Sequence, residues 1–216
     1  MLTLATLGGH DLITTRVTWN AEVSRIVQAR CVSCHSAGGR APMPLTSYKE
    51  ARPWARAIKE EVLTRRMPKW HAVRGYGAFS NDPSLSSFEI ALIAAWVDGG
   101  APEGSPGAAN MPVSRPSDAR NLDRVKDVVA PCGEAPIEAG ILHGLRPELA
   151  KGDDVGIAVR MPDGRTEPLA RIRDFDPKFA LTYWLRQPLN IPDGARLVTT
   201  SPTPPTCRVV LTMAQP

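Results

Sequence analysis

The sequence contains no long hydrophobic run and no strong excess of charge of one sign. No apolar segment approaches the ~20 residues that span a bilayer, and the uncharged start, residues 1–7, is too short for a signal-peptide core. The net charge is only +4, and basic and acidic residues alternate along the chain, which does not indicate a nucleic-acid surface. We therefore expect no direct membrane span and no nucleic-acid partner.

The bulk composition is that of a folded soluble protein. Hydrophobic residues make up 43% and charged residues 22% of the 216 residues, which argues against general disorder and against a scaffold held by disulfides alone. The contents of Pro, 21 residues, and Gly, 17 residues, are high for a purely helical bundle. A chain of this length most simply forms two small domains.

Three segments in the first half have the periodicity of helices. Apolar residues recur at helical spacing over residues 19–30 and again over residues 48–66. The clearest start signal is Ser86 with Glu89 three residues later, a capping box, and Gly99 supplies the matching stop. These segments predict a helical first domain, residues 15–105, preceded by an N-terminal arm, residues 1–14.

The pattern changes after a Pro-rich linker, residues 106–131. The rest of the chain consists of short β-prone segments separated by turns, two of which have the sequence Pro-Asp-Gly. This half, residues 132–216, predicts a small antiparallel β-sandwich. The β-prone segments are 155–161, 169–172, 181–185, 197–200 and 207–212.

The most informative motif is the run Cys31-Val-Ser-Cys34-His35. Its CxxCH spacing lets two thiols each add to one vinyl group of a haem while the following imidazole binds the iron. A redox disulfide or half of a zinc site are the simpler interpretations. Zinc would need a second CxxC or an HxxxH, which the sequence lacks, and the helical flanks are unlike those of thioredoxin. One covalent haem c is the favoured prediction.

The opposite face of such an iron needs a second ligand. Met67 is preferred because it follows a predicted helix and Pro68 would stiffen the loop that presents it. His71 is the main competitor, since it would give a bis-imidazole iron of lower potential. The other candidates are Met43, Met111 and His10.

Together these motifs resemble the class I cytochrome c domain. The resemblance is carried by His35 after the cysteines, by Met67 before a proline and by the segment 85–102, and it covers about residues 15–105. It implies an all-α domain with one haem, with His35 and Met67 as the two metal ligands. It also implies that Trp54 and Trp70 line the haem or donate an indole N–H to a propionate.

The second half resembles the C-terminal domain of copper type II monooxygenases of the peptidylglycine-hydroxylating kind. The matching segments include His143-Gly-Leu145 and both Pro-Asp-Gly turns. That family holds copper with a His-x-His pair and a later methionine, but Leu145 stands at the second histidine position. Met213 is not assigned the methionine role. We expect no copper and a retained scaffold without its catalysis, so that the predicted fold class is an α + β two-domain chain, an all-α cytochrome c domain followed by the sandwich.

A cytochrome of this kind matures in an oxidising, exported compartment, where two remaining cysteines in one domain are expected to pair. This implies a disulfide between Cys132 and Cys207. It also implies a periplasmic or exported location, with peripheral attachment to a membrane as an option.

The implied function is that of a periplasmic mono-haem electron carrier without enzymatic activity, free or as a subunit of a larger redox complex. Its partners would be redox proteins, among them a membrane-bound respiratory or photosynthetic complex. Nine basic residues against three acidic ones between Arg40 and Arg74 predict a positive collar that docks an acidic partner. The alternatives are a haem or copper oxidoreductase, peroxidase-like or monooxygenase-like, and a non-catalytic structural subunit.

Overall fold

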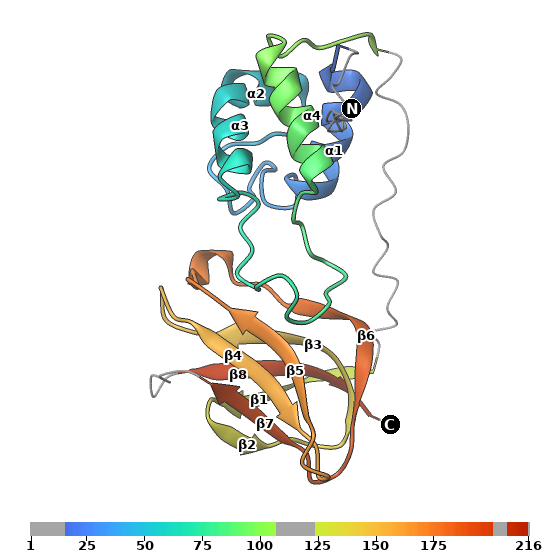
Figure 1. Cartoon of the computed structure of the whole chain (residues 1–216), viewed down its shortest axis with the longest axis vertical. Helices are drawn as coiled ribbons and strands as arrows, with labels where there is room; N and C mark the ends of the chain where they lie inside the picture. The colour runs from blue at the N-terminus through green and yellow to red at the C-terminus, as the bar shows by residue number, and fades with distance from the viewer. Residues whose placement is uncertain (1–15, 107–123, 201–206, 216) are drawn as a thin grey trace, which may run out of the picture. The chain divides into compact units, whose positions relative to one another are not determined.

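The computed structural model describes residues 16–106, 124–200 and 207–215 (Figure 1). They divide into two compact units. The helical unit consists of residues 16–68 and 83–106, and the β unit of residues 69–82 together with the described residues from 124 onward. The chain thus leaves the helical unit after Pro68, contributes residues 69–82 to the β unit and returns at Pro83. We call residues 69–82 the insert.

Some predicted features fall outside the described residues. They are the N-terminal arm with His10, and most of the Pro-rich linker with Met111.

The helical unit contains four α-helices within its described residues. A π-helical turn, Trp19–Val23, leads into α1 (Ser24–Arg30). The next predicted helix is divided into α2 (Tyr48–Ala51), a 3-10 turn (Arg52–Trp54) and α3 (Ala55–Leu63), and the last helix is α4 (Ser87–Asp98).

Capping residues fix where two of these helices begin. The side chain of Ser86 accepts the backbone N–H of Glu89, and the Glu89 carboxylate accepts the backbone N–H of Ser86, which confirms the predicted capping box. Ser47 and Glu50 make the same reciprocal pair at the start of α2. Each box satisfies donors that a helix start otherwise leaves without partners.

The core of the helical unit forms around Trp96, which is fully buried on α4. The Trp96 indole N–H donates to the carbonyl of Pro102 at 3.0 Å, so the polar atom of the ring is satisfied inside the core. The ring of Trp19 lies 5.8 Å from that of Trp96, centroid to centroid. This pair connects the first turn of the unit to its last helix.

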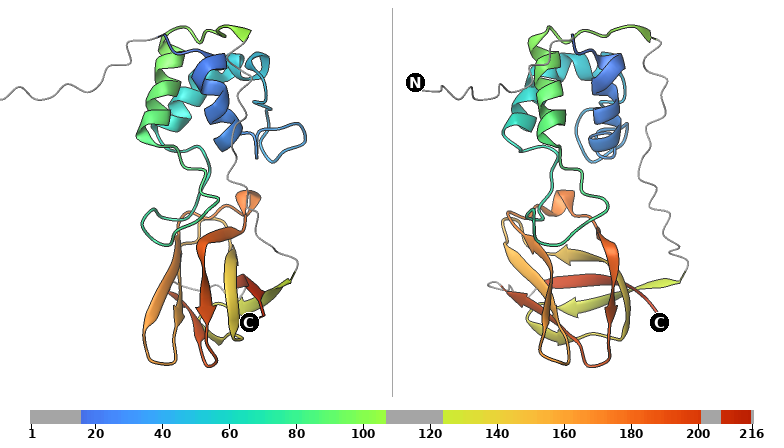
Figure 2. Two further views of the ribbon diagram at one scale, coloured as in Figure 1. Left: turned by 90° about the vertical axis from the view of Figure 1, so that its right-hand side faces the viewer. Right: turned by 45° about the vertical axis from the view of Figure 1, so that its right-hand side comes forward.

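The β unit is a sandwich of two antiparallel four-stranded sheets (Figure 2). One has the strand order β1-β8-β3-β6 and the other β2-β7-β4-β5. Buried and exposed positions alternate along strands such as β4, as expected where one face of a sheet packs on the core. The strands are β1 (Val125–Pro131), β2 (Glu134–Pro136), β3 (Gly140–Glu148), β4 (Val155–Arg160), β5 (Thr166–Ile172), β6 (Tyr183–Ile191), β7 (Arg196–Thr200) and β8 (Arg208–Ala214).

A disulfide joins Cys132, just after β1, to Cys207, just before β8, which confirms the predicted pairing. The backbone N–H of Cys132 also donates to the carbonyl of Cys207 at 3.1 Å. The bridge therefore continues the β1–β8 ladder beyond its last residue pair.

The insert covers the sheet edges formed by β5 and β6. The N–H of Val73 donates to the carbonyl of Arg171 in β5 at 2.7 Å, and the N–H of Ser80 donates to the carbonyl of Trp184 in β6 at 2.9 Å. Phe79 is buried at 5% exposure among the hydrophobic residues of the sandwich. One segment thus pairs with an edge strand of each sheet, which protects edges that would otherwise be open to association.

The predicted fold class, an all-α cytochrome c domain followed by a small sandwich, is wrong. Within the described residues, eight strands outnumber four α-helices, and three of those helices have nine residues or fewer. The segment after Met67, expected to remain in a cytochrome domain, belongs to the β unit instead. It does so because Trp70 and Phe79 contribute to the sandwich core.

Candidate functional site

The CxxCH motif forms one compact turn at the end of α1. The N–H of Cys31 donates to Val27, and the N–H groups of Cys34 and His35 donate to the carbonyl of Cys31 at 3.1 and 2.9 Å. Both cysteines are half-buried, and neither takes part in a disulfide. One turn therefore carries two partly buried cysteines.

The pKa of the Cys31 thiol is far above its ordinary value. Burial, with a contribution from the charge of Cys34, raises the pKa of the Cys31 thiol to about 12. Arg30 acts in the opposite direction but does not offset burial. Cys31 is consequently a thiol, not a thiolate, at neutral pH.

The side chain of His35 is held by a contact with the backbone of Met43. Its Nδ1 lies 3.0 Å from the carbonyl oxygen of Met43. A carbonyl can only accept, so the neutral ring carries its proton on Nδ1 and presents Nε2 as an acceptor. The loop after the motif folds back on it, since the N–H of Leu45 donates to the carbonyl of His35 at 2.9 Å.

The turn is joined to α4 by an ion pair. The Arg30 guanidinium donates to the carboxylate of Glu89 at 3.0 Å, and the same carboxylate accepts the N–H of Ser86. Burial would raise the pKa of Glu89, but the hydrogen bonds from Ser86 and Arg30 hold it below its usual range. Glu89 thus stays ionised while it both caps α4 and positions the residue before Cys31.

The other predicted site residues are Met67 and Trp54, which lie in the helical unit, and Trp70, which does not. Met67 is half-buried in the helical unit, just after α3, and Trp54 on the same unit is 45% exposed. Trp70 belongs to the β unit, where its ring lies 4.7 Å from that of Tyr183, centroid to centroid. Trp54 and Trp70 therefore belong to different units.

His71, the competing ligand, is a buried residue of the β unit. Its Nε2 accepts the backbone N–H of Asp176 at 3.3 Å, so Nδ1 carries the proton and lies 3.4 Å from the hydroxyl of Tyr183. Burial, followed by the charge of Lys69, lowers the pKa of His71, while Asp176 and Asp174 act to raise it. Both ring nitrogens are thus used to hold the insert.

Part of the positive charge predicted as a docking collar is paired. Arg66 lies 3.1 Å from a carboxylate oxygen of Glu60 and 2.9 Å from one of Glu61, and its pKa is raised by these hydrogen bonds. Lys59 is paired with Asp98. The collar stays a prediction, with less unpaired charge than the sequence alone indicates.

Sequence reasoning missed the insert and the recess that it helps to form. The insert contains His71 and Phe79, whose partners lie about 100 residues further on in the chain, so no local pattern could indicate them. The recess, lined by Tyr76 and by strands β4 and β5, needs the pairing of those strands to be known.

Comparison with known proteins assigns no family. No family model and no curated protein matches this chain. Six chains of solved structures match, and two of them are described as a pentameric capsid protein isolated from metagenomic phage sequences. The first is 17% identical and covers 50% of this chain and 74% of its own, and the second is 18% identical and covers 45% and 64%. Both have a TM-score of 0.27, too low to assign a fold or a function.

These findings correct the resemblances drawn from the motifs. No family model matches this chain that would support either assignment. The described residues contain no group of three or more His, Cys, Asp and Glu side chains that could hold a metal ion. The covalent haem c, with Met67 as its second ligand, is therefore withdrawn.

Among the residues that the structure describes, no helix is both long and apolar enough to cross a membrane.

Proposed function

We propose that this chain is an exported electron-transfer protein whose redox group is the thiol pair Cys31 and Cys34. One observation carries the proposal: two unbridged, half-buried thiols share one helical turn, while the other two cysteines of the chain form a disulfide. A formed disulfide supports an oxidising compartment such as the periplasm. There the dithiol would donate two electrons, either as a free protein or as a subunit of a larger redox assembly.

The pKa of Cys31 assigns an order to the two thiols. Thiolates attack disulfides, and a thiol with a pKa of about 12 is almost entirely protonated at neutral pH. Cys34 is therefore the residue that attacks the partner disulfide and forms a mixed disulfide with one partner sulfur. Cys31 then displaces that sulfur, which leaves a Cys31–Cys34 disulfide and a reduced partner, with two electrons and two protons transferred. His35, the next residue after Cys34, presents Nε2 as an acceptor when its ring is neutral.

The experiment equilibrates the full chain in redox buffers of graded potential, traps free thiols with an alkylating reagent and measures the intact mass. The expected result is a single two-electron transition for Cys31 and Cys34, with Cys132–Cys207 oxidised throughout the same range. A Cys34→Ser variant should show no two-electron transition. A variant with Cys132→Ala and Cys207→Ala is the matched control and should keep it.

Two outcomes would contradict the proposal. One is a pair of thiols that stays reduced at every potential where Cys132–Cys207 is oxidised. The other is an intact mass above that of the polypeptide which reductant does not remove, because both sulfurs would then be blocked by a covalent group.

A further inference from the structure

The β unit has a recess of about 480 Å³ that plays no part in the proposed thiol chemistry. Its floor is β4, flanked by β5 on one side and β7 on the other. Along β4, Val155, Ile157 and Val159 are buried in the sandwich core, so Gly156 and Ala158 between them face outward. The floor is therefore low because its outward positions carry no side chain or only a methyl group.

Gly156, at the centre of this floor, lies against the side chain of Thr200. A Cβ atom placed on Gly156 would collide with the hydroxyl oxygen of Thr200, the residue that pairs with Gly156 from β7. The Thr200 hydroxyl thus lies directly against the floor, as a polar group beside an otherwise apolar surface.

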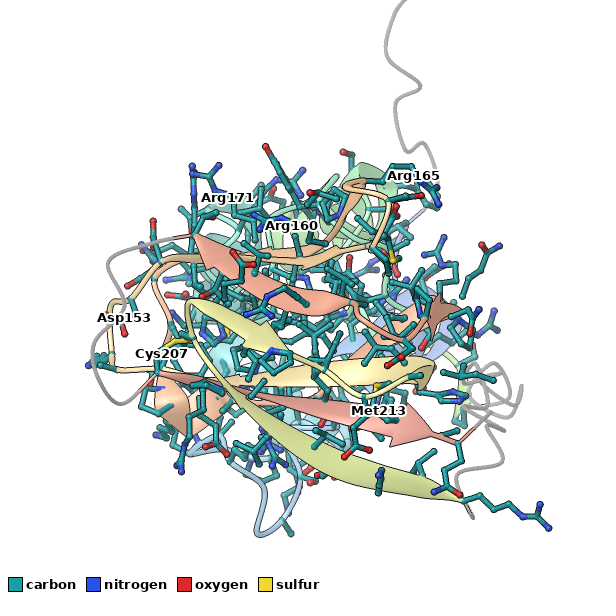
Figure 3. All side chains as sticks on the ribbon, turned by 90° about the horizontal axis from the view of Figure 1, so that it is seen from below. Asp153, Arg160, Arg165, Arg171, Cys207 and Met213 are labelled. Atoms are coloured by element: carbon teal, nitrogen blue, oxygen red, sulfur yellow. A yellow bond between two sulfur atoms is a disulfide. The ribbon has the colours of Figure 1, made fainter. Side chains whose placement is uncertain are left out.

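The walls combine an aromatic ring with a cation. Tyr76 of the insert is 45% exposed, and the guanidinium carbon of Arg171 lies 5.8 Å from the centroid of its ring. Arg171, labelled in Figure 3, is on β5, where it pairs with Gly156 of β4. Contact with an aromatic face does not use the N–H donors of a guanidinium, so Arg171, which lines the recess, can still donate hydrogen bonds to a ligand.

A carboxylate completes the rim. Asp154 precedes β4 and lines the recess, and one of its oxygens accepts the backbone N–H of Asp174 at 2.9 Å. This bond fixes the side chain and leaves the other oxygen as an acceptor. The recess therefore offers a donor, an acceptor and a hydroxyl around an apolar floor.

We propose that the recess binds a neutral sugar unit of a glycan. A phosphate or sulfate would be repelled by Asp154, and a hydrocarbon would leave both Arg171 and Asp154 without partners when it excludes water. A sugar ring has an apolar face of C–H groups for the floor and the Tyr76 ring, and hydroxyls that both donate and accept for the rim. A volume of about 480 Å³ is in the usual range for small-ligand sites and accommodates one or two sugar rings.

The test follows the backbone amides of the full chain by NMR during titration with maltotriose, cellotriose, mannotriose and triacetylchitotriose. At least one trisaccharide should shift the amides of residues 154–158 and 168–171. Replacing Tyr76 by Ala removes a wall, and replacing Ala158 by Leu fills the floor, so each should weaken binding about tenfold or more. Arg165→Ala, at a highly exposed arginine of the same unit, is the control and should bind as the unaltered chain does.

The proposal fails if none of the four sugars shifts these amides, or if both recess variants bind as tightly as the control. It also fails if inorganic phosphate alone shifts the same amides, because the ligand would then be an anion. Tyr76→Ala alters the insert, whereas Ala158→Leu alters only the floor of the recess. Weaker binding by Ala158→Leu therefore cannot be attributed to a disturbed insert. Neither result bears on the thiol pair, which lies in the other unit.

Discussion

Replacing Phe79 by Ala should release the insert from the sandwich. Phe79 is 5% exposed, and its ring centroid lies 5.8 Å from that of Trp70 and 5.4 Å from that of Tyr183. Truncation of a buried phenylalanine costs ~3–5 kcal/mol through lost burial and the cavity left behind. We expect about 3 kcal/mol here, because backbone hydrogen bonds at both ends of the insert remain.

Native-state hydrogen exchange measures this loss where it occurs. The N–H groups of Val73 and Ser80 donate to β5 and β6, so they exchange only when the insert opens. A loss of about 3 kcal/mol should speed their exchange roughly a hundredfold. Phe88→Ala is the matched control, since Phe88 on α4 is 67% exposed and should change stability by less than about 0.5 kcal/mol. Unchanged exchange of both amides in Phe79→Ala would refute the role of the insert in the sandwich core.

Three further predictions concern the β unit. Gly77→Ala should destabilise this unit more than Gly75→Ala does, as measured by urea unfolding. Both glycines have a positive φ, which costs an alanine ~1–2 kcal/mol. Only at Gly77 would the added methyl group also collide with a backbone carbonyl of β5. Because burial lowers the pKa of His71, the unfolded chain binds a proton more readily than the folded chain does. The contribution of His71 to the free energy of unfolding is therefore fully present above the ordinary histidine pKa of about 6.5 and is lost as the pH falls below it towards the lowered value. The urea midpoint should fall between pH 8 and pH 5, and it should fall less in His71→Gln. Replacing Cys132 and Cys207 together by Ala opens a loop of 75 residues and should reduce the free energy of unfolding by about 4 kcal/mol, measured by urea unfolding without reductant.

The elements that the sequence predicts well are those specified by neighbouring residues. The capping box of Ser86 and Glu89 needs only a spacing of three, and α4 begins where it indicates. The two Pro-Asp-Gly turns likewise separate the strands expected on either side, β4 from β5 and β6 from β7. Local chemistry is sufficient for such features because the hydrogen bonds that fix them close within a few residues.

Elements specified by distant partners were missed. Strand β1 lies in a segment expected to be a linker, because most of its positions are exposed or half-buried and its only regular partner, β8, is about 80 residues away. The insert was assigned to the helical half because it follows α3 directly. Its true environment depends on β5 and β6, which no pattern within residues 69–82 describes.

The candidate site was located but misread. The spacing of Cys31 and Cys34 correctly marked two thiols on one helical turn, and the pairing of Cys132 with Cys207 was correct. The raised pKa of Cys31 comes from burial, which the spacing alone does not reveal. Trp70 was assigned to the same site through a family pattern, whereas its contacts are with Phe79 and Tyr183 of the β unit.

The β unit is built from two separate segments of the chain, which are synthesised at different times. Residues 69–82 leave the ribosome long before β5 and β6, the strands that they cover, have been translated. Trp70 and Phe79 therefore have no sandwich core to enter during that interval, and contacts so distant in sequence form slowly. A nascent chain therefore exposes this aromatic segment until β5 and β6 have been made, and exposed apolar surface of this kind favours association.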